Sequence, residues 1–195
     1  MYTIGIDEAG RGALAGPVVV SVVALPKNLK LPRGGMPPLR DSKRLSRNYR
    51  KEWLNYIKSN PDIFYASARV YQGPIDRKNI AKAANIAASR ALDRLLEELP
   101  RKNYSVLLDG SLFLASRNHR DIGARTIIRG DEKYASIKLA SIVAKVTRDE
   151  YMIRLHKKYP DYEFPRHKGY GTKLHKLRIK KHGICDAHRL TFIKN

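Results

Sequence analysis

The chain has 195 residues, 43% of them hydrophobic, which suits a single compact domain with a core of its own. Its 39 Lys and Arg against 18 Asp and Glu give a formal net charge of +21, which indicates a polyanionic partner, nucleic acid or an anionic membrane surface. The single cysteine excludes an internal disulfide framework, and the longest apolar run, residues 17–25, is too short to span a bilayer. Because the N-terminus has no signal-peptide pattern, the sequence favours a cytoplasmic protein.

The first part of the chain predicts three strands and one helix. Residues 2–6 form a short apolar run, and the β-branched run at 18–25 predicts a second, buried strand. Gly and Pro are frequent over 26–38, which indicates a surface loop. A helix is expected over 46–59, and the alternation over 63–71 predicts the third strand.

The second part of the chain is mainly helical. Asp76 is the predicted N-cap of an Ala-rich helix that runs to Leu99. Two short strands, 104–108 and 126–128, come next, and the pattern is helical again over 132–157. Beyond these elements the chain is basic and helix-like. Strands first, then helices interleaved with further strands, predict an α/β fold with a mixed sheet.

Acidic side chains follow three of the predicted strands. Asp7 and Glu8 come after the first strand, and Asp109 and Asp131 follow the two short ones. Clustered at one sheet edge, these carboxylates would repel each other unless cations lay between them. Mg²⁺ and Mn²⁺ prefer such oxygen ligands, and two ions about 4 Å apart are a standard device for phosphodiester hydrolysis. The pattern therefore predicts a two-metal nuclease site, and the alternative is acidic strand ends that face water.

Asp149 competes with Asp131 for the fourth position. If residues 131–157 are largely helical, Asp149 lies 18 residues beyond Asp131, a rise of about 27 Å, so the two cannot share a site. We choose Asp131 because it lies near a strand end and a helix N-terminus. Asp149 is expected to pair with neighbouring basic groups on the helix surface.

A Gly-rich turn and a basic tail are candidates for binding nucleic acid. Gly10, Arg11 and Gly12 form a turn that can approach a sugar-phosphate backbone closely, because glycine has no Cβ; a plain β-turn is the alternative. Tyr170, flanked by glycines in the basic segment 166–181, can present its ring to a sugar or base, and the alternative is a solvated basic helix.

Other polar segments carry weaker signals. Residues 41–44 and 145–148 add cationic groups for phosphates, among them Lys43, Lys145 and Arg148. The spacing of His182, Cys185 and His188 hints at zinc, but a structural zinc site needs four ligands at firmer spacing.

Taken together, these segments resemble the type 2 ribonuclease H family, ribonuclease HII. The resemblance covers nearly the whole chain. In contrast to the N-cap expected from the pattern alone, it places the start of the long helix at Asn79-Ile80. It rests mainly on six motifs, which are Gly5-Ile6-Asp7-Glu8-Ala9-Gly10-Arg11-Gly12, Asp41-Ser42-Lys43, Leu108-Asp109-Gly110, Gly130-Asp131, Ala140-Ser141-Ile142-Val143-Ala144-Lys145-Val146-Thr147-Arg148-Asp149 and His167-Lys168-Gly169-Tyr170-Gly171-Thr172.

The resemblance implies a fold and a division of the chain. The fold would be an RNase H-like mixed sheet flanked by helices, with a catalytic domain over 1–160. The basic C-terminal segment, 161–195, would pack on that domain and complete the substrate groove. Because the chain stops soon after Phe192, we expect no C-terminal peptide for docking on a sliding clamp. We further expect no membrane partner, and a monomer as the default.

The resemblance also implies an activity and its residues. The enzyme would hydrolyse the RNA strand of RNA–DNA hybrids and cut on the 5′ side of ribonucleotides embedded in duplex DNA, leaving 3′-OH and 5′-phosphate ends. Mg²⁺ or Mn²⁺, two ions in the active complex, would be held by four carboxylates, and the turn and an aromatic ring would read the junction between ribose and deoxyribose. The metal-holding residues would be Asp7, Glu8, Asp109 and Asp131, and those binding nucleic acid would be Gly10, Arg11, Gly12, Lys43, Lys145, Lys168 and Tyr170.

Two other hypotheses remain open at this stage. A basic RNA- or DNA-binding protein without catalysis would share the charge, but such a binder has no use for acids that face phosphates. A nuclease of the wider RNase H-like group with a different substrate would share the carboxylates but not the roles of the turn and of Tyr170.

Overall fold

A computed structural model describes the chain except residues 33, 101–102, 117–118, 120–121 and 194–195. Its centre is a mixed five-stranded sheet in the order β3-β2-β1-β4-β5. The first three strands along the chain pair antiparallel, whereas β4 pairs parallel with β1 and with β5. The strands are β1 (Tyr2–Ala9), β2 (Val18–Pro26), β3 (Phe64–Val70), β4 (Tyr104–Asp109) and β5 (Arg125–Ile127). The predicted mixed α/β fold is confirmed.

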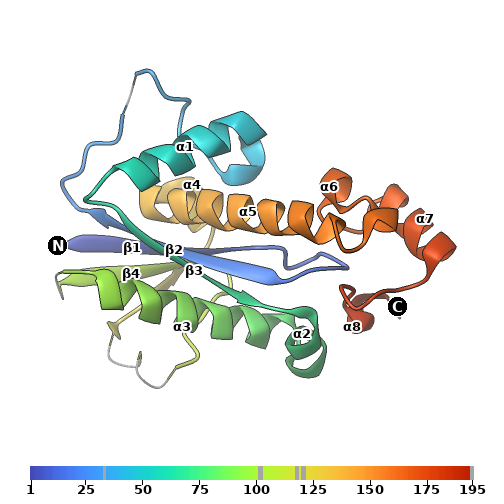
Figure 1. Ribbon diagram of the computed structural model, residues 1–195. Helices are drawn as coiled ribbons and strands as arrows, with labels where there is room; N and C mark the ends of the chain where they lie inside the picture. Colours follow the sequence, from blue (N-terminus) through green and yellow to red (C-terminus); the bar gives the residue numbers. More distant parts are fainter. Residues whose placement is uncertain (33, 101–102, 117–118, 120–121, 194–195) are drawn as a thin grey trace.

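Helices cover both faces of the sheet (Figure 1). On one side lie α1 (Arg47–Ser59), the short α4 (Gly130–Lys133) and the long α5 (Ala135–His156), and on the other lie α2 (Gln72–Lys78) and α3 (Ile80–Glu98). A 3-10 helix, η1 (Ser42–Arg44), precedes α1. The C-terminal elements gather at one end of the molecule, beyond the ends of β1 and β2, and are η3 (Pro160–Tyr162), α6 (Phe164–His167), α7 (Lys173–His182) and α8 (Leu190–Ile193).

The two faces of the sheet bury different side chains. Against α3 the core is rich in alanine, including Ala84, Ala87 and Ala91, whose small side chains let the helix lie close to the strands. Against α1 and α5 the core contains Trp53, which is fully buried and donates its indole N–H to a backbone carbonyl. At Gly5 a Cβ would lie 2.2 Å from the backbone of Ser136, so β1 and the start of α5 make a close contact that only glycine permits.

The predicted start of the Ala-rich helix is wrong. The segment forms two helices, α2 and α3, which meet at Asn79 with a φ of 70°. Asn79 is the N-cap of α3, and its side chain accepts a hydrogen bond from the amide of Lys82; asparagine tolerates positive φ better than most residues. Asp76 lies inside α2, and its carboxylate accepts from the amides of Leu190 and Thr191 at 3.0 Å each.

Two further boundaries differ from the prediction. The helix expected over 132–157 begins earlier and is interrupted at Tyr134, so that Asp131 lies in the first turn of the short α4. Asp7 and Glu8 lie within β1 rather than after it, because β1 pairs with β2 as far as Ala9. The pairing of β1 with β4 stops at Ile6, however, so both acids lie where that side of the strand is open.

A membrane-spanning helix requires about 20 consecutive apolar residues. None of the helices in the described part of the chain has that length and character.

Candidate active site

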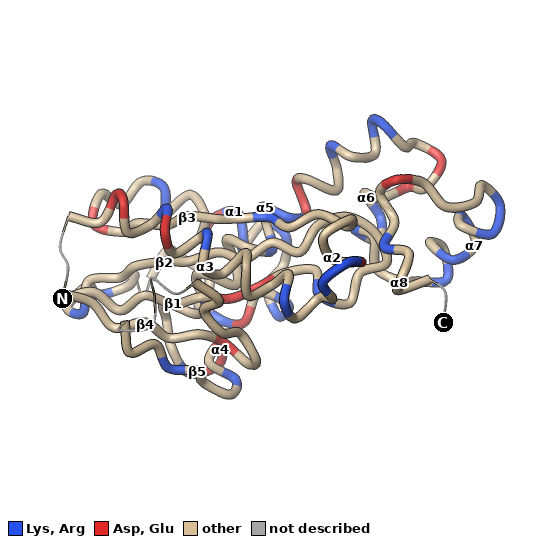
Figure 2. The backbone as a smooth tube through the Cα atoms, turned by 90° about the horizontal axis from the view of Figure 1, so that it is seen from below, with Lys and Arg blue, Asp and Glu red and all other residues tan. Residues whose placement is uncertain are grey.

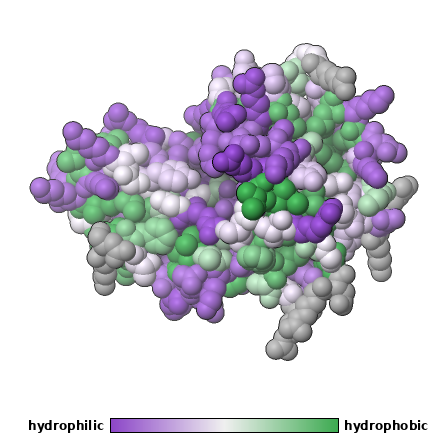
Figure 3. Space-filling model, turned by 180° about the vertical axis from the view of Figure 1, so that it is seen from behind, coloured by the Kyte–Doolittle hydropathy of each residue, from purple (hydrophilic) through white to green (hydrophobic). Residues whose placement is uncertain are grey.

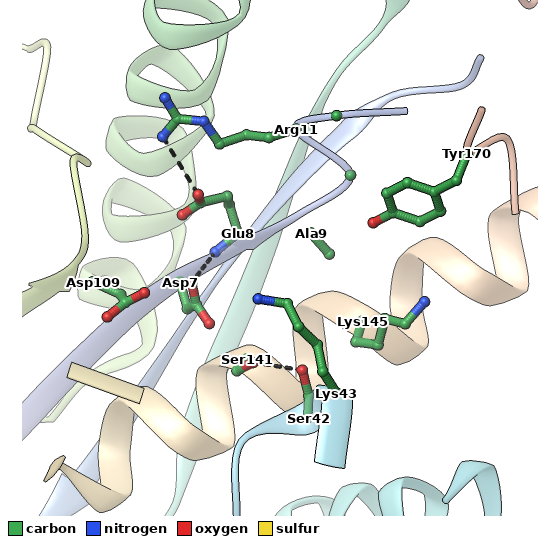
Figure 4. A pocket seen from close by; sticks show the side chains of 12 residues that line it. Asp7, Glu8, Ala9, Arg11, Ser42, Lys43, Asp109, Ser141, Lys145 and Tyr170 are labelled. Carbon is green, nitrogen blue, oxygen red and sulfur yellow. Dashed lines mark hydrogen bonds and ion pairs between the residues drawn. The ribbon is translucent and has the colours of Figure 1, made fainter. Parts of the chain in front are cut away.

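A pocket lies at the carboxyl ends of β1 and β4, beside α5 (Figure 4). Most of the predicted site residues line it, including three of the four carboxylates. They are Asp7, Glu8, Asp109, Gly10, Arg11, Gly12, Lys43, Lys145 and Tyr170. Asp131 and Lys168 do not line the pocket.

The strand register brings the carboxylates together. Because Ile6 pairs with Leu108 in the parallel ladder, the next residues, Asp7 and Asp109, leave neighbouring strands at the same edge. Glu8 donates its backbone N–H to the Asp7 carboxylate at 2.7 Å, while its own carboxylate lies 3.4 Å from the guanidinium of Arg11. Arg11 also donates to the hydroxyl of Ser111 at 2.7 Å.

Burial and mutual repulsion make negative charge unfavourable at the carboxylate corner, the group formed by Asp7, Glu8 and Asp109. Burial, followed by the charges of Glu8 and Asp109, raises the pKa of Asp7 well above its usual value. Burial also raises the pKa of Glu8, although Arg11 acts against it. One oxygen of Glu8, Oε2, is buried and has no hydrogen-bond partner among the residues that the structure describes. Carboxylates with these properties fit a divalent cation, which would relieve the repulsion and satisfy the unpaired oxygen.

Asp131 lies next to this group rather than in it. The Asp109 carboxylate accepts from the backbone N–H groups of Gly130 at 2.6 Å and Asp131 at 3.2 Å, and so it binds the first turn of α4. Burial raises the pKa of Asp131, and the charge of Asp109 raises it further. Within the described residues, no three His, Cys, Asp or Glu side chains are grouped closely enough to hold one metal ion.

Lys43 reaches into the pocket from η1 (Figure 4). Its backbone is fixed by Ser42, whose hydroxyl lies 2.7 Å from that of Ser141 on α5. Partial burial acts to lower the pKa of Lys43, but the charges of Asp41 and Asp7 outweigh it and raise the pKa. The two serines had no predicted role, although both lie in the motifs that carry the resemblance.

Two fully buried arginines support the Gly-rich turn. Gly10 has a φ of +93°, and a Cβ there would lie 2.0 Å from Nε of Arg148. The expectation that Arg148 contacts phosphates is wrong, because its side chain is fully buried. Arg148 and Arg189 donate to backbone carbonyls around the turn at 2.8 to 3.1 Å, with Ala15, Pro17 and Lys168 as acceptors for the first and Arg11 and Gly16 for the second.

The two remaining lysines and Tyr170 differ in their positions. Lys145 forms an ion pair with Asp149 at 2.7 Å, which confirms the predicted pairing of Asp149, and its ammonium lies 5.7 Å from the centre of the Tyr170 ring. The Arg148 guanidinium lies 5.1 Å from the same ring centre. Lys168 donates from its ammonium to the carbonyl of Pro165.

A five-stranded mixed sheet flanked by helices, with acids at the carboxyl ends of its central strands, defines an RNase H-like nuclease. Residues 4–195 match the family model described as Ribonuclease HII. The chain is 45% identical to ribonuclease HII of Endomicrobium trichonymphae over 192 residues, 96% of this chain and 83% of that one. It is 42% identical to ribonuclease HII of Chlamydia pneumoniae over 188 residues, 96% of this chain and 81% of that one.

A solved structure agrees with these sequence relatives. The structure of the PCNA:RNase HII complex from Archaeoglobus fulgidus matches with a TM-score of 0.76 and 26% identity, over 97% of this chain and 94% of that one. The chain therefore belongs to the ribonuclease HII family, and it is a metal-dependent ribonuclease.

Proposed function

We propose that this enzyme is an endonuclease that hydrolyses the RNA strand of RNA–DNA hybrids and cuts on the 5′ side of ribonucleotides embedded in duplex DNA. The products would carry 3′-OH and 5′-phosphate ends. One observation carries the proposal: a single pocket contains three of the four carboxylates, the Gly10–Gly12 turn and Tyr170. Hydrolysis needs the carboxylates, and discrimination of ribose from deoxyribose needs groups that contact the sugar, which the turn and Tyr170 would supply.

In this proposal Asp7, Glu8 and Asp109 hold Mg²⁺ or Mn²⁺, and Asp131 completes the set. When bound, two such ions supply Lewis-acid activation of water and neutralise charge on the leaving oxygen. The unpaired Oε2 of Glu8 and the raised pKa of Asp7 support the assignment. Asp131 does not line the pocket, but it lies next to Asp109, whose charge raises the pKa of Asp131.

The turn is suited to donate hydrogen bonds to a 2′-OH group. Arg189 binds the carbonyl of Arg11 at 2.8 Å, and in a trans peptide the following N–H, that of Gly12, points the opposite way. Apart from Gly12 and its two chain neighbours, no atom of the described residues lies within 4 Å of the place where a Cβ of Gly12 would be, so a sugar has access there. Only the 2′-OH distinguishes RNA from DNA at one position.

Tyr170 would stack on the deoxyribose next to the ribonucleotide. Its ring lies on the far side of the pocket from Asp109, with Lys43 reaching between them (Figure 4). The cations of Arg148 and Lys145 near the ring limit its orientations, because each attracts the π face.

The basic surface would bind the phosphates of the duplex. Lys and Arg are spread over the C-terminal segment in Figure 2, and in Figure 3 hydrophilic side chains cover parts of that end of the molecule as well as the upper middle of the face. We assign phosphate contacts to Lys43, Lys145 and Lys168, and we assign residues 161–195 to one wall of the groove. Such contacts would make binding steeply dependent on salt. The proposal places the enzyme in the cytoplasm as a monomer.

Cleavage of a labelled DNA duplex with one embedded ribonucleotide tests the proposal, with Mg²⁺ or Mn²⁺ and with EDTA. A single metal-dependent cut 5′ to the ribonucleotide is expected. Cleavage of a continuous RNA–DNA hybrid alone would remove the junction role and keep the nuclease. Cleavage of neither, with tight salt-sensitive binding, would support a binder without catalysis.

A further inference from the structure

Three histidines form a buried stack behind Tyr170. The rings of His167 and His175 are 4.2 Å apart at 17°, and those of His175 and His188 are 5.3 Å apart at 28°. They come from α6, from α7 and from the turn before α8, and their exposed fractions are 6%, 0% and 2%. None of them lines the pocket, and the proposed function uses none of them.

The hydrogen bonds of two of these rings determine which nitrogen of each ring donates and which accepts. Nδ1 of His175 lies 3.0 Å from the carbonyl oxygen of Tyr170, and a carbonyl only accepts, so Nδ1 carries the proton. In a neutral ring Nε2 is then an acceptor, and Nε2 of His188, 3.1 Å away, has to donate to it. That leaves Nδ1 of His188 as an acceptor, which agrees with the backbone N–H of Cys185 pointing at it from 2.9 Å. The carbonyl oxygen of Cys185 also lies 3.2 Å from this Nδ1, but it already accepts the shorter bond from the amide of His188 at 2.9 Å. We call this chain, from Cys185 through His188 and His175 to Tyr170, the histidine relay.

His167 fixes the other side of the same backbone. Its carbonyl accepts the N–H of Tyr170 at 2.9 Å, and its Nδ1 accepts the N–H of Gly169 at 3.1 Å. Its Nε2 donates to the carbonyl of Tyr162 at 2.8 Å, so this ring too is satisfied as a neutral tautomer. The amide of Tyr170 is therefore bound by the backbone of His167, whose ring fixes the neighbouring Gly169, and the carbonyl of Tyr170 accepts from the His175 ring and from the amide of Thr172 at 2.8 Å.

The same segment is hydrogen-bonded to residues 13–15, which follow the Gly-rich turn. Gly169 accepts from the amide of Leu14 at 2.8 Å, and Leu14 accepts from the amide of Arg189, the residue after His188, also at 2.8 Å. Isolated bridges join Ala13 to Tyr170 and Ala15 to His188. These bonds hold the segment that contains Tyr170 against the residues that follow the turn.

The surroundings of the stack keep it uncharged at neutral pH. Burial lowers the pKa of all three histidines and brings that of His175 to about 4. The groups around His188 are Cys185, with Sγ 3.2 Å from Nδ1, and Tyr162, with its ring centre 4.9 Å away. Near His167, Glu163 acts to raise the pKa while Lys168 and Arg166 act to lower it. A second proton between His175 and His188 would place two N–H groups head to head.

We propose that His167, His175 and His188 are positioning residues that hold the backbone of Tyr170 for recognition of the ribose–deoxyribose junction. The proposal rests on the junction role of Tyr170 in the proposed function. It assigns no contact with substrate to any histidine. A buried stack that served stability alone would have no reason to act on the choice of substrate.

The test measures a selectivity ratio, kcat/KM for an embedded ribonucleotide divided by kcat/KM for a long hybrid. His175→Phe keeps the ring and removes both relay bonds, and we expect the ratio to fall about tenfold, as for the loss of a buried hydrogen bond. His175→Asn can place an amide N–H near the position of Nδ1, and we expect it to restore most of the ratio. His182→Phe, the same substitution at an exposed position of α7, is the matched control and should leave the ratio unchanged.

A double variant separates this proposal from the proposed function. In the Tyr170→Ala background, His175→Phe should change the ratio no further, because the residue that it positions is gone. If Tyr170→Ala by itself leaves the ratio unchanged, the junction role fails and the relay proposal fails with it. If Tyr170→Ala lowers the ratio and a folded His175→Phe does not, the relay proposal alone is overturned.

The wild-type protein provides a test that needs no variant. Nitrogen NMR of the imidazoles should show His175 protonated at Nδ1 and His188 at Nε2 at pH 7, and the opposite tautomers would overturn the relay. The selectivity ratio should stay constant from pH 8 to 6 and fall at lower pH. Protonation of the carboxylates slows cleavage of both substrates and cancels in the ratio, so a fall there reports the relay.

Discussion

The carboxylate corner and the Tyr170 side of the pocket are built in opposite ways. Asp7, Glu8 and Asp109 share one sheet edge, where burial raises the pKa of Asp7 and of Glu8. Among the described residues one oxygen of Glu8 is buried without a hydrogen-bond partner, so the group fits a cation that the protein does not itself provide. On the other side, buried arginines and neutral histidines donate their N–H groups to backbone carbonyls. If the proposed function holds, the catalytic side of the pocket is electrostatically incomplete without metal, whereas the side that recognises the substrate is organised before the substrate arrives.

Removal of a carboxylate should have the largest effect on the first region. Asp109→Asn keeps an oxygen that can accept from Gly130 and Asp131, but it removes the charge that would hold the metal. We expect cleavage to fall more than about 10³-fold, while binding of hybrid in EDTA is retained or tightened because a negative charge near the phosphates is lost. Gel-shift and cleavage assays on one preparation check both. Retained cleavage would refute the assignment of Asp109.

On the Tyr170 side of the pocket, by contrast, removal of a buried arginine should lower the stability of the fold. Arg148→Met removes the donor for three backbone carbonyls, and we expect the free energy of unfolding to fall by about 3 kcal/mol. Arg154→Met, on an exposed position of the same helix, is the control and should be nearly neutral. Urea denaturation measures both. Equal stability of the two variants would show that buried arginine does not support the turn.

Two glycines of one turn should separate stability from recognition. In Gly10→Ala the new methyl meets Arg148 at a positive φ, so we expect a loss of about 2 kcal/mol in unfolding free energy. In Gly12→Ala the methyl meets no protein atom, so the unfolding free energy should change little. Cleavage at an embedded ribonucleotide should nevertheless fall in Gly12→Ala, because the methyl occupies the space that the sugar needs. Full cleavage by a folded Gly12→Ala would contradict the role of the turn.

The same contrast explains how much the sequence could predict. The carboxylates were predictable because strand ends are visible in apolar runs, and parallel pairing places Asp7 beside Asp109. The interruption of the helix at Tyr134 could not be predicted, because the local sequence pattern stays helical across it. Tertiary packing decides where the helix is interrupted. Asn79 as a cap was missed by pattern alone, since Asp76 is an equally good cap on composition.

The buried cations and histidines were harder still to predict. Lys145 and Arg148 stand three residues apart on α5, and only the fold makes one a pocket residue and the other a buried support. The histidines of the C-terminal segment gave at most a hint of zinc, because spacing along the chain does not show that His188 bonds to His175. Residue type predicts charge, but partners depend on long-range contacts.

The smallest expected effect concerns the metal-free stability of the carboxylate corner. The pKa of Asp7 is higher in the folded protein than in the unfolded chain, so its ionised form opposes folding at neutral pH, and stability should rise as pH falls through that raised pKa. Asp7→Asn removes the charge at constant size, and we expect it to stabilise the protein in EDTA at pH 7 by about 1 kcal/mol. The difference from wild type should shrink as pH falls.

Mg²⁺ should stabilise wild type more than the variant, because only wild type has the full set of ligands. Thermal unfolding in EDTA and in Mg²⁺ at several pH values measures these differences, and a less stable Asp7→Asn in EDTA would mean that the corner is not strained by its charges.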